Sequence, residues 1–262
     1  LYQYHTKVAE HYFCSECGIY THHKMRSRPD TFGLNVGCID DIDQFQHITK
    51  VLRMGVGSEL ELFDGLGTQV RAIIQSISRN KIEYKIISKD TTHKTNERSV
   101  SAIVPVIKRE AFIFMVQKLT EVGVEKILIY RSELEDQTVR KKKNFAWDDY
   151  ARDIASRACE QSGNNFLPNC EIAESLQKAL EFFHASFEDG IFVSLDPNAT
   201  SSIFDISNNT NQALTVISGP ESGFSDNESN ILKANDVMSC SLGTNILRAE
   251  TAPIVGVFAL MR

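Results

Sequence analysis

Between residues 46 and 90, apolar and polar positions alternate with the period of β-strands that bury one face. The alternating runs are Glu59–Phe63, Thr68–Ile77 and Lys81–Ile87. Asp64-Gly65-Leu66-Gly67 separates the first two runs, and an Asp-Gly step in this position is a strong hairpin signal. The pattern predicts a small antiparallel sheet or barrel over residues 46–95. The polar segment Ser88–Ser99 is interpreted as an interdomain linker.

From residue 101 the pattern changes to short apolar runs separated by helical periods, which is typical of an α/β domain with a mainly parallel sheet. The expected strands are Ala102–Ile107, Ile127–Tyr130, Ile191–Leu195, Leu214–Ile217 and Val237–Leu242. The expected helical faces are Phe112, Met115, Val116, Leu119 and Val122, and Trp147, Tyr150, Ile154 and Ala158. We interpret these apolar sets as core and residues 101–262 as the second domain.

Two glycine-bearing loops follow late strands. Residues 218–225 run from the strand Leu214–Ile217 into a helix that carries Glu228, and residues 243–252 run from the strand Val237–Leu242 into a C-terminal helix. Open α/β sheets bind ligands at the carboxyl ends of their strands, and glycine lets backbone approach a ligand closely. Neither loop has the spacing of a phosphate-binding loop. We therefore expect a small-molecule site without a nucleotide phosphate; a tight structural turn is the alternative.

The composition is that of a globular chain without a membrane-spanning segment. With 262 residues and 42% hydrophobic content, the chain can form one large domain or two modest ones. No apolar run approaches the roughly 20 residues that span a bilayer, and a secretory signal pattern is absent, so we expect a cytoplasmic protein. Cysteines scattered through a long chain favour reduced thiols. They are Cys14, Cys17, Cys38, Cys159, Cys170 and Cys240.

The charge is unevenly distributed along the chain. A formal net charge of −6 argues against a protein coated with basic surface for non-specific nucleic-acid binding. Residues 46–96 nevertheless hold eight Lys and Arg against five Asp and Glu, whereas residues 181–262 hold three against ten. A second basic cluster is Arg140-Lys141-Lys142-Lys143. We expect a polyanion to contact these two basic regions first; a solvated helix entry is the alternative for the lysine run.

Ordered motifs over residues 46–262 resemble the RsmE family, which methylates N3 of a uridine in small-subunit ribosomal RNA. The C-terminal motifs are Gly219-Pro220-Glu221-x-Gly223-Phe224-Ser225 with Glu228, and Ser241-Leu242-Gly243 with Ile246-Leu247-Arg248-x-Glu250-Thr251-Ala252. The upstream motifs are His47-Ile48-x-Lys50-Val51-Leu52-Arg53-Met54, Phe63-Asp64-Gly65-x-Gly67, Gln117-Lys118-x-Thr120-Glu121-x-Gly123-Val124 and Ala158-Cys159-Glu160-Gln161-Ser162-Gly163. They stand in family order, and chance does not account for so many matches.

This resemblance implies a SPOUT-type fold, an α/β domain in which helices cover both faces of a parallel sheet and the C-terminal segment threads a trefoil knot. A PUA-like β-barrel at residues 46–95 would handle the RNA. The resemblance also implies a homodimer that methylates small-subunit (16S) rRNA, free or assembled, with S-adenosyl-L-methionine bound in the knot. The residues it assigns to the cofactor are Leu195, Gly219, Pro220, Glu221, Gly223, Ser241, Leu242, Gly243, Asn245, Ile246 and Leu247.

Arg248 and Glu250 follow the second loop and are the candidate catalytic residues. Methyl transfer is a displacement at the sulfonium carbon that requires near-attack alignment, and uracil N3 must lose its proton. Glu250 is interpreted as a base or positioning group, and Arg248 as a cation that favours the developing uridine anion. An ion pair that fixes the knot is the alternative. The residues expected to contact RNA are Lys50, Arg53, Lys108, Lys118 and Gln161.

Several positions depart from the family pattern. Ser222 replaces the second glycine of Gly-Pro-Glu-Gly-Gly, and Leu134, Asn164 and Asn245 stand where arginine is expected. Loss of three cations would weaken phosphate contacts, since each charged hydrogen bond contributes roughly 1.5–3 kcal/mol. A catalytically weakened protein that binds RNA or cofactor is therefore the alternative to the enzyme.

Residues 1–45 depart further, since a family member would begin with a short basic strand. The motif Phe13-Cys14-Ser15-Glu16-Cys17-Gly18 resembles the C-terminal part of the Gfa-like zinc fold. A tetrahedral zinc needs four ligands, and the upstream cysteines are missing. Candidate replacements are His22, His23 and Cys38. We expect no metal and interpret the segment as a fragment that extends the barrel edge; a zinc-dependent glutathione-adduct enzyme is a remote alternative.

Overall fold

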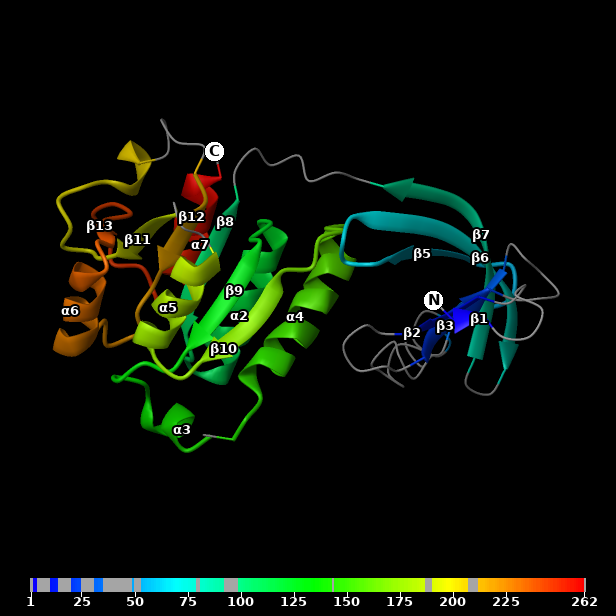
Figure 1. The fold of residues 1–262 in the computed structure, drawn as a ribbon, viewed down its shortest axis with the longest axis horizontal. Coiled ribbons are helices and arrows are strands. Elements are labelled where there is room, and N and C mark those ends of the chain that lie inside the picture. Colours follow the sequence, from blue (N-terminus) through cyan, green and yellow to red (C-terminus); the bar gives the residue numbers. More distant parts are fainter. Residues whose placement is uncertain are drawn as a thin grey trace. The chain divides into compact units, whose positions relative to one another are not determined.

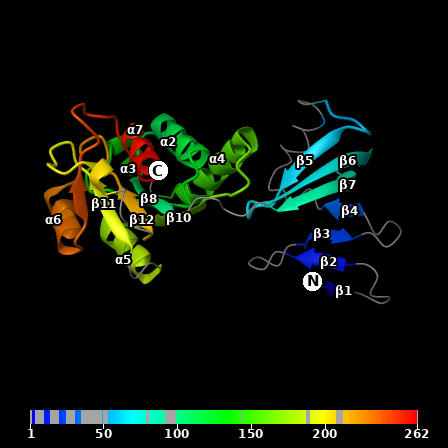
Figure 2. The same ribbon diagram turned by 90° about the horizontal axis from the view of Figure 1, so that it is seen from above.

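The chain forms two compact units, Leu1–His93 and Lys94–Arg262, in a computed structural model. The structure describes residues 2–3, 10–13, 20–24, 31–34, 49, 53–78, 81–91, 99–142, 144–186, 190–206 and 212–261. The first unit contains strands β1–β7, and the second contains strands β8–β13 with helices α2–α7 (Figures 1 and 2).

The first unit is an antiparallel sheet. Its strands are β1 (Tyr2–Gln3), β2 (Glu10–Phe13), β3 (Tyr20–Lys24), β4 (Thr31–Leu34), β5 (Glu59–Phe63), β6 (Thr68–Ser78) and β7 (Lys81–Thr91), in the spatial order β1-β2-β3-β4-β7-β6-β5. The inward positions of β5–β7 supply a small core of Leu60, Ile74 and Ile82. The predicted antiparallel sheet is confirmed, and among the described strands no pairing between β1 and β5 closes it into a barrel.

The predicted hairpin at Asp64-Gly65 is confirmed. The Asp64 carboxylate accepts backbone N–H bonds from Leu66 (2.7 Å) and Thr68 (3.0 Å). Gly65 and Gly67 have φ values of +74° and +102°, which residues with a side chain rarely adopt. The side-chain acceptor and the two glycines together reverse the chain, so that β5 and β6 pair from the residues that flank the loop onward.

The predicted linker Ser88–Ser99 is wrong at its start, because Ser88–Thr91 continue β7. The long strand β6 offers these residues partners as far as Thr68, which pairs with Thr91, and pairing satisfies backbone groups that a linker would leave to water. Residues 92–98 lie outside the described residues. On its other side β7 pairs with β4, so the backbone of Thr31–Leu34 extends the sheet.

The second unit is a parallel sheet of six strands. Its elements are β8 (Val100–Pro105), α2 (Arg109–Glu121), β9 (Lys126–Tyr130), α3 (Gln137–Arg140), α4 (Trp147–Ser162), β10 (Asn169–Ala173), α5 (Leu176–Ser186), β11 (Ile191–Leu195), the 3-10 helix η2 (Ile203–Asp205), β12 (Leu214–Ile217), α6 (Asp226–Ala234), β13 (Met238–Cys240) and α7 (Thr251–Leu260). The spatial order is β10-β9-β8-β12-β11-β13, with parallel pairing throughout. The predicted α/β class is confirmed.

Helices cover both faces of this sheet, as predicted. Helices α2, α4 and α7 bury Phe112, Trp147 and Val257 in one core, and α5 and α6 bury Phe183 and Leu232 in the other. Successive residues of a strand point to opposite faces of the sheet, so alternate residues pack into opposite cores. Figure 1 shows α2 and α4 running side by side along the sheet, in agreement with their close packing. The two predicted helical faces are confirmed: they are buried except at Val122 and Tyr150, which are partly buried and pack against the same core.

The C-terminal segment packs against the connection between β11 and β12. Ser241 N–H donates to Ser201 O (2.9 Å), Ile203 N–H donates to Ser241 O (3.1 Å), and α7 contacts η2. Strand β13 ends at Cys240, two residues earlier than predicted, because Ser241 forms an isolated bridge with Ser202 of this connection. These are contacts that the expected trefoil knot requires; the threading itself stays a prediction.

Candidate functional site

The two glycine-bearing loops leave the sheet beside one another. Ser194 of β11 pairs with Ile217 of β12, and Leu195 of β11 pairs with Cys240 of β13. The segments that follow Ile217 and Cys240 therefore start on either side of the end of β11, about 10 Å apart, since neighbouring strands lie about 4.8 Å apart. This is the carboxyl edge of the sheet, where α/β proteins bind ligands (Figure 1).

The start of the first loop is bonded to two other strands. Ser218 N–H donates to Ile103 O of β8 (3.0 Å), and the hydroxyl of Tyr130, at the end of β9, donates to Ser218 O (3.0 Å). Tyr130 is fully buried. Burial raises the pKa of Tyr130 well above its usual value, and the nearby Glu228 carboxylate raises it further, so the hydroxyl remains a donor at neutral pH.

The turn of the first loop is too tight for a side chain at Gly219. A Cβ on Gly219 would lie 3.2 Å from the backbone carbon of Gly223, and Gly223 N–H donates to Pro220 O (2.9 Å). Gly223 itself has φ +75°, a conformation that favours glycine. Ser222 and Glu221 are exposed on the outside of this turn, so the substitution at position 222 leaves the turn intact.

Glu228 joins the first loop to the end of β9. Its side chain is buried and accepts hydrogen bonds from Ser132 Oγ (3.2 Å), Glu133 N–H (3.1 Å) and Ser225 N–H (2.9 Å). Ser225 Oγ accepts from Glu228 N–H in return, which completes a capping box at the start of α6. Three donors offset the cost of burying this carboxyl group, and they fix the loop against β9.

Glu133 adds a second link between the same segments. Its exposed carboxylate accepts hydrogen bonds from Ser225 Oγ (2.5 Å) and Asn227 Nδ2 (2.6 Å), and these bonds lower the pKa of Glu133. Sequence reasoning missed Tyr130, Ser132 and Glu133 as site residues. The available signal was their position directly at and after the carboxyl end of a predicted strand, at the same edge as the loops.

The second loop is held only at its ends. Within the described structure the five residues Gly243–Leu247 make no hydrogen bond, and Gly243 has φ +130°. Ile246 exposes 83% of its surface, whereas Leu242 is partly buried and packs against the core. Segments with so few contacts are the ones that adjust to ligands.

Leu195 is buried under α7. A Cβ on Gly256 of α7 would stand 3.2 Å from Leu195 Cδ1 and 3.1 Å from Val216 Cγ1, so the absence of a side chain at position 256 lets the helix lie directly on β11 and β12. The Leu195 side chain thus belongs to the core. A contact between Leu195 and a cofactor would have to come from its backbone at the end of β11.

Arg248 and Glu250 form a loose ion pair. Arg248 Nη1 lies 3.8 Å from Glu250 Oε1, and the side chain of Arg248 is 85% exposed while that of Glu250 is 15% exposed. An ion pair of this length with one exposed partner contributes at most about 1 kcal/mol, so it does little to hold the C-terminal segment in place. The guanidinium remains available to an incoming anion.

In the second unit, the residues predicted to contact RNA lie at opposite edges of the sheet. Lys50 lies outside the described residues, and Arg53 is exposed in the first unit, with φ +51°. Lys108 is exposed after β8, at the carboxyl edge, and pairs with Asp136 (3.5 Å). Helix α2 then returns about 20 Å to the opposite edge. There Lys118, which pairs with Glu121 at 2.7 Å, and the exposed Gln161 lie near the ends of α2 and α4.

Two of the departures from the family pattern have defined surroundings. Asn164 Nδ2 donates to Thr120 O (3.1 Å), and its Oδ1 accepts from Phe166 N–H (3.0 Å), so Asn164 ties the end of α4 to the end of α2. Leu134 is 41% exposed at the carboxyl edge. Asn164 therefore has a structural role in joining two helix ends, whereas Leu134 presents an apolar surface where a cation is expected.

The chemistry of the two loops suits a cofactor without phosphate. They offer the backbone groups of glycine turns and the apolar side chains of Leu242 and Leu247, which are half-buried. Ser218 Oγ, at the end of β12, is buried and has no hydrogen-bond partner within the described structure. Buried polar atoms normally have one, so this hydroxyl is free to meet a ligand. S-adenosyl-L-methionine, with its adenine and amino-acid groups, fits such a set.

Neither a metal cluster nor a membrane helix emerges from the described part of the chain. No group of three or more His, Cys, Asp and Glu side chains there is arranged to hold a metal ion. Cys14, Cys17 and Cys38 lie outside the described residues, as do the side chains of His22 and His23. None of the described helices combines the length and the apolarity needed to cross a bilayer.

Comparison with known proteins identifies the family. The profile of the RNA methyltransferase domain matches residues 94–261, and that of the RNA methyltransferase PUA domain matches residues 39–87. Ribosomal RNA small subunit methyltransferase E of Bacillus subtilis is 25% identical over 230 residues, which cover 83% of this chain and 87% of the relative. The protein of the same name from Rickettsia conorii is 28% identical over 221 residues, covering 82% and 85%.

Solved structures agree with this assignment. Ribosomal RNA small subunit methyltransferase E of Neisseria gonorrhoeae, bound to S-adenosyl methionine, has a TM-score of 0.72 at 25% identity, covering 87% of this chain and 90% of that one. A putative methyltransferase of Legionella pneumophila, in complex with the same cofactor, has a TM-score of 0.75 at 26% identity, covering 88% and 90%. The chain therefore belongs to the RNA methyltransferase family that includes ribosomal RNA small subunit methyltransferase E, with an RNA methyltransferase domain preceded by a PUA domain.

Proposed function

We propose that this chain transfers the methyl group of S-adenosyl-L-methionine to N3 of a uridine in small-subunit (16S) ribosomal RNA. The observation that carries the proposal is the meeting of two glycine-bearing loops at the ends of β11, β12 and β13. The relatives that share this fold over most of their length are named as small-subunit rRNA methyltransferases, and a solved one holds the cofactor. We place the activity in the cytoplasm.

In this proposal the two loops hold the cofactor between them. S-adenosyl-L-methionine supplies a methyl group on a sulfonium sulfur, and the protein has to fix its position. The first loop is already fixed by Tyr130 and Glu228, so its backbone groups are arranged before binding, which reduces the ordering cost. The second loop closes on the opposite side. The assigned residues are Gly219, Pro220, Glu221, Gly223, Ser241, Leu242, Gly243, Asn245, Ile246 and Leu247, with the backbone of Leu195 and the hydroxyl of Ser218.

Arg248 and Glu250 act on the uracil in this proposal. N3 of uracil carries a proton, and its removal leaves an anion delocalised over the ring. Glu250 accepts or orients this proton, and Arg248 stabilises the anion. The exposure of Arg248 and its loose pairing with Glu250 at 3.8 Å support these roles, because a side chain locked in a short ion pair would have to break it first.

The proposal includes a homodimer. The exposed Ile246, beside the proposed cofactor site, and the exposed Phe114 of α2 are large apolar side chains in one protomer. A second copy that covers such side chains would remove them from water. Sedimentation velocity of the purified chain should give twice the mass of 29.5 kDa, and a monomer at micromolar concentration would contradict this part.

The test of the activity is methyl transfer to small ribosomal subunits that lack uridine N3 methylation. Labelled S-adenosyl-L-methionine should give label in 16S rRNA at one uridine, located by a stop in reverse transcription. Arg248→Ala and Glu250→Gln should lower kcat by about 10²-fold or more, as removal of a charge-stabilising or proton-accepting group does. Lys233→Ala, an exposed position on α6, is the control and should retain the rate.

A second candidate is a protein that binds RNA or cofactor without turnover. Leu134 and Asn245, both exposed, and the bonded Asn164 stand where arginine is expected and favour this candidate. Binding of both S-adenosyl-L-methionine and small subunits without transfer of label would support it over the enzyme.

A further inference from the structure

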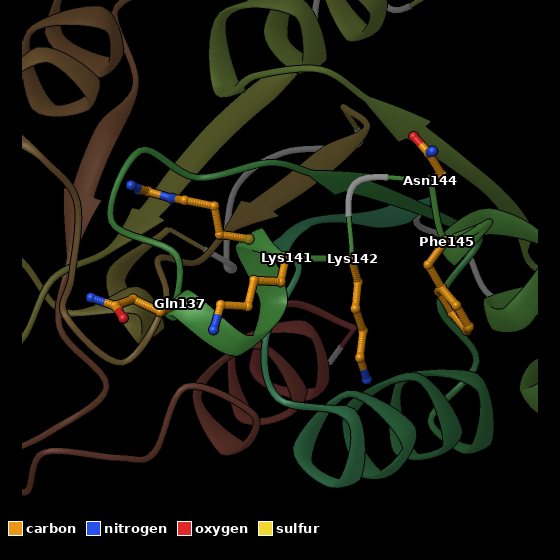
Figure 3. A pocket seen from close by; sticks show the side chains of 6 residues that line it. Gln137, Lys141, Lys142, Asn144 and Phe145 are labelled. Carbon is orange, nitrogen blue, oxygen red and sulfur yellow. The ribbon is translucent and has the colours of Figure 1, made fainter.

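An open depression lies at the carboxyl edge of the second unit, apart from the two loops. It is formed by α3 and the segment that leads into α4, and its volume is about 850 Å³. Its lining residues are Gln137, Arg140, Lys141, Lys142, Asn144 and Phe145. Three of the six are cations, one is aromatic and two carry side-chain amides, so the lining combines charge, stacking surface and hydrogen-bonding groups (Figure 3).

The local backbone brings the cations and the aromatic ring together. Lys142 N–H donates to Val139 O (2.9 Å), Phe145 N–H donates to Lys142 O (3.2 Å), and Trp147 N–H donates to Phe145 O (2.9 Å). The second of these bonds holds the backbones of Lys142 and Phe145 close together. In Figure 3 the side chains of Lys141, Lys142 and Phe145 extend to the same side, whereas Asn144 points the other way.

The two lysines are available for an anion. Both are exposed, and within the described structure neither has an ion-pair partner. Arg140 is held differently: its guanidinium donates to Glu133 O (2.8 Å) and lies 3.9 Å from a carboxylate oxygen of Glu135, with 56% of its side chain exposed. Arg140 therefore provides a positive charge held by hydrogen bonding, beside two exposed lysines that have no ion pair within the described structure.

The Phe145 ring is held in place by its neighbours. It meets Trp147 edge to face, with centroids 4.7 Å apart at 63°, and Tyr150 in the same manner at 5.4 Å and 81°. Trp147 is fully buried, so this contact anchors the ring to the core. Phe145 nevertheless leaves 37% of its surface exposed. An aromatic ring that is fixed on one side and open on the other is a stacking platform for a base.

The depression is tied to the first loop of the proposed cofactor site. The segment that enters α3 carries Glu133, which accepts hydrogen bonds from Ser225 and Asn227. The N-cap of α3, Asp136, pairs with Lys108 at 3.5 Å. The depression thus lies at the edge of the sheet where methyl transfer is proposed to occur.

We infer that this depression binds a single-stranded segment of the RNA substrate, with phosphates on Lys141 and Lys142 and one unpaired base stacked on Phe145. The inference rests on the proposed function. Unpaired nucleotides expose both their base faces and their phosphates, whereas a duplex keeps its bases stacked inside. The depression thereby holds the strand next to the target uridine at the carboxyl edge, a role that the acidic C-terminal region cannot take.

The first test compares two double variants of the full chain that lose the same charge. Lys141→Ala with Lys142→Ala removes the proposed phosphate contacts, and Lys178→Ala with Lys233→Ala removes two exposed cations elsewhere in the second unit. Fluorescence anisotropy with a labelled 12-nucleotide single-stranded RNA should show about tenfold weaker binding for the first pair only. The slope of log K against log salt should fall by about 1.4, because each single-strand phosphate contributes about 0.7. Equal affinities and equal slopes in the two variants would overturn the inference.

The second test addresses the stacked base. Phe145→Leu keeps an apolar side chain over Trp147 but removes the aromatic face, and it should weaken binding of the single-stranded RNA about fivefold or more. Binding of a duplex of the same length should not change. An equal loss with single strand and duplex, or no loss with either, would overturn the stacking assignment.

A titration with S-adenosyl-L-methionine separates this inference from the proposed function. The cofactor depends on the loops and not on the depression, so all these variants should bind it like the wild type. Wild-type protein that fails to bind the cofactor would contradict the proposed function, whereas the RNA affinities of the variants decide the role of the depression.

Discussion

The two loops of the proposed cofactor site are held in different ways. Residues 218–225 are bonded to β8, β9 and α6, through the backbone of Ser218 and the buried carboxyl group of Glu228. Residues 243–247 make no hydrogen bond within the described structure. Residues 218–225 are therefore held in place by the folded protein itself, whereas residues 243–247 are expected to become ordered when the ligand binds. Changes in the first loop should alter stability and affinity together, whereas changes in the second should alter affinity alone.

Removal of the Glu228 carboxyl group should have the largest effect. Glu228→Ala leaves Ser132 Oγ and the N–H groups of Glu133 and Ser225 without their acceptor, and the free energy of unfolding should fall by about 3 kcal/mol. Urea denaturation measures this change. Glu221→Ala, which removes an exposed carboxylate of the same loop, should stay within about 0.5 kcal/mol of the wild type. Similar losses in both variants would show that the first loop is not fixed through Glu228.

The second largest effect should come from high pH, which should lower the free energy of unfolding through Tyr130, the residue that anchors the first loop. Burial raises the pKa of Tyr130 well above the unfolded value of about 10, so its stabilising contribution is complete below pH 10. That contribution is lost as the pH rises from 10 toward the folded pKa, by up to about 1.4 kcal/mol per pH unit. In the first unit, burial raises the pKa of Tyr84 to about 12, so it adds a loss between pH 10 and 12. When urea denaturation is repeated at increasing pH, the free energy of unfolding should fall less steeply in Tyr130→Phe than in the wild type. Equal slopes in the two proteins would show that the pKa of Tyr130 is not raised by burial.

At neutral pH the Tyr130 hydroxyl should contribute a smaller amount. Tyr130→Phe keeps the ring in the core but removes the donor to Ser218 O, and stability should fall by about 1 kcal/mol. S-adenosyl-L-methionine should also bind several-fold more weakly, because the carbonyl that starts the first loop loses its anchor. Unchanged affinity, measured by calorimetry, would mean that the position of this loop does not depend on Tyr130.

The second loop should respond in the opposite way. Gly243→Ala places a side chain at φ +130°, but a loop without hydrogen bonds can shift to relieve the strain, so stability should change by less than about 0.5 kcal/mol. The shifted loop should bind S-adenosyl-L-methionine about tenfold more weakly. Gly163→Ala, at φ +69° in the C-cap of α4, is the matched control: stability should fall by about 1 kcal/mol and affinity should stay the same. Lost stability with unchanged affinity in Gly243→Ala would contradict the view that the second loop is not fixed before the cofactor binds.

Elements with a strong period were predictable from the sequence, and those defined by packing were not. The strands β8, β9, β11 and β12 are short apolar runs and were predicted. Strand β10 was missed because it is an edge strand whose exposed positions interrupt the apolar pattern. Helix α5 was missed although Leu176, Ala179, Leu180 and Phe183 follow helical spacing.

The sequence allowed the position of the site to be predicted, but not the hydrogen bonds that hold its first loop. The loops follow strands, and parallel strands bring their carboxyl ends together, so their meeting could be anticipated. The bonds from Tyr130 to Ser218 and from Ser132 to Glu228 join positions far apart in the chain and depend on the strand order. Lys118 was assigned to RNA from a motif, but α2 carries it away from the carboxyl edge.

Calorimetric titration of the full chain with S-adenosyl-L-methionine tests the central claim most directly. If the loops after β12 and β13 form one pocket, the titration will show one cofactor per chain. Saturating cofactor will then raise the unfolding temperature, because binding stabilises the folded state. A folded protein that gives no binding heat and no change in unfolding temperature at millimolar cofactor would contradict the claim.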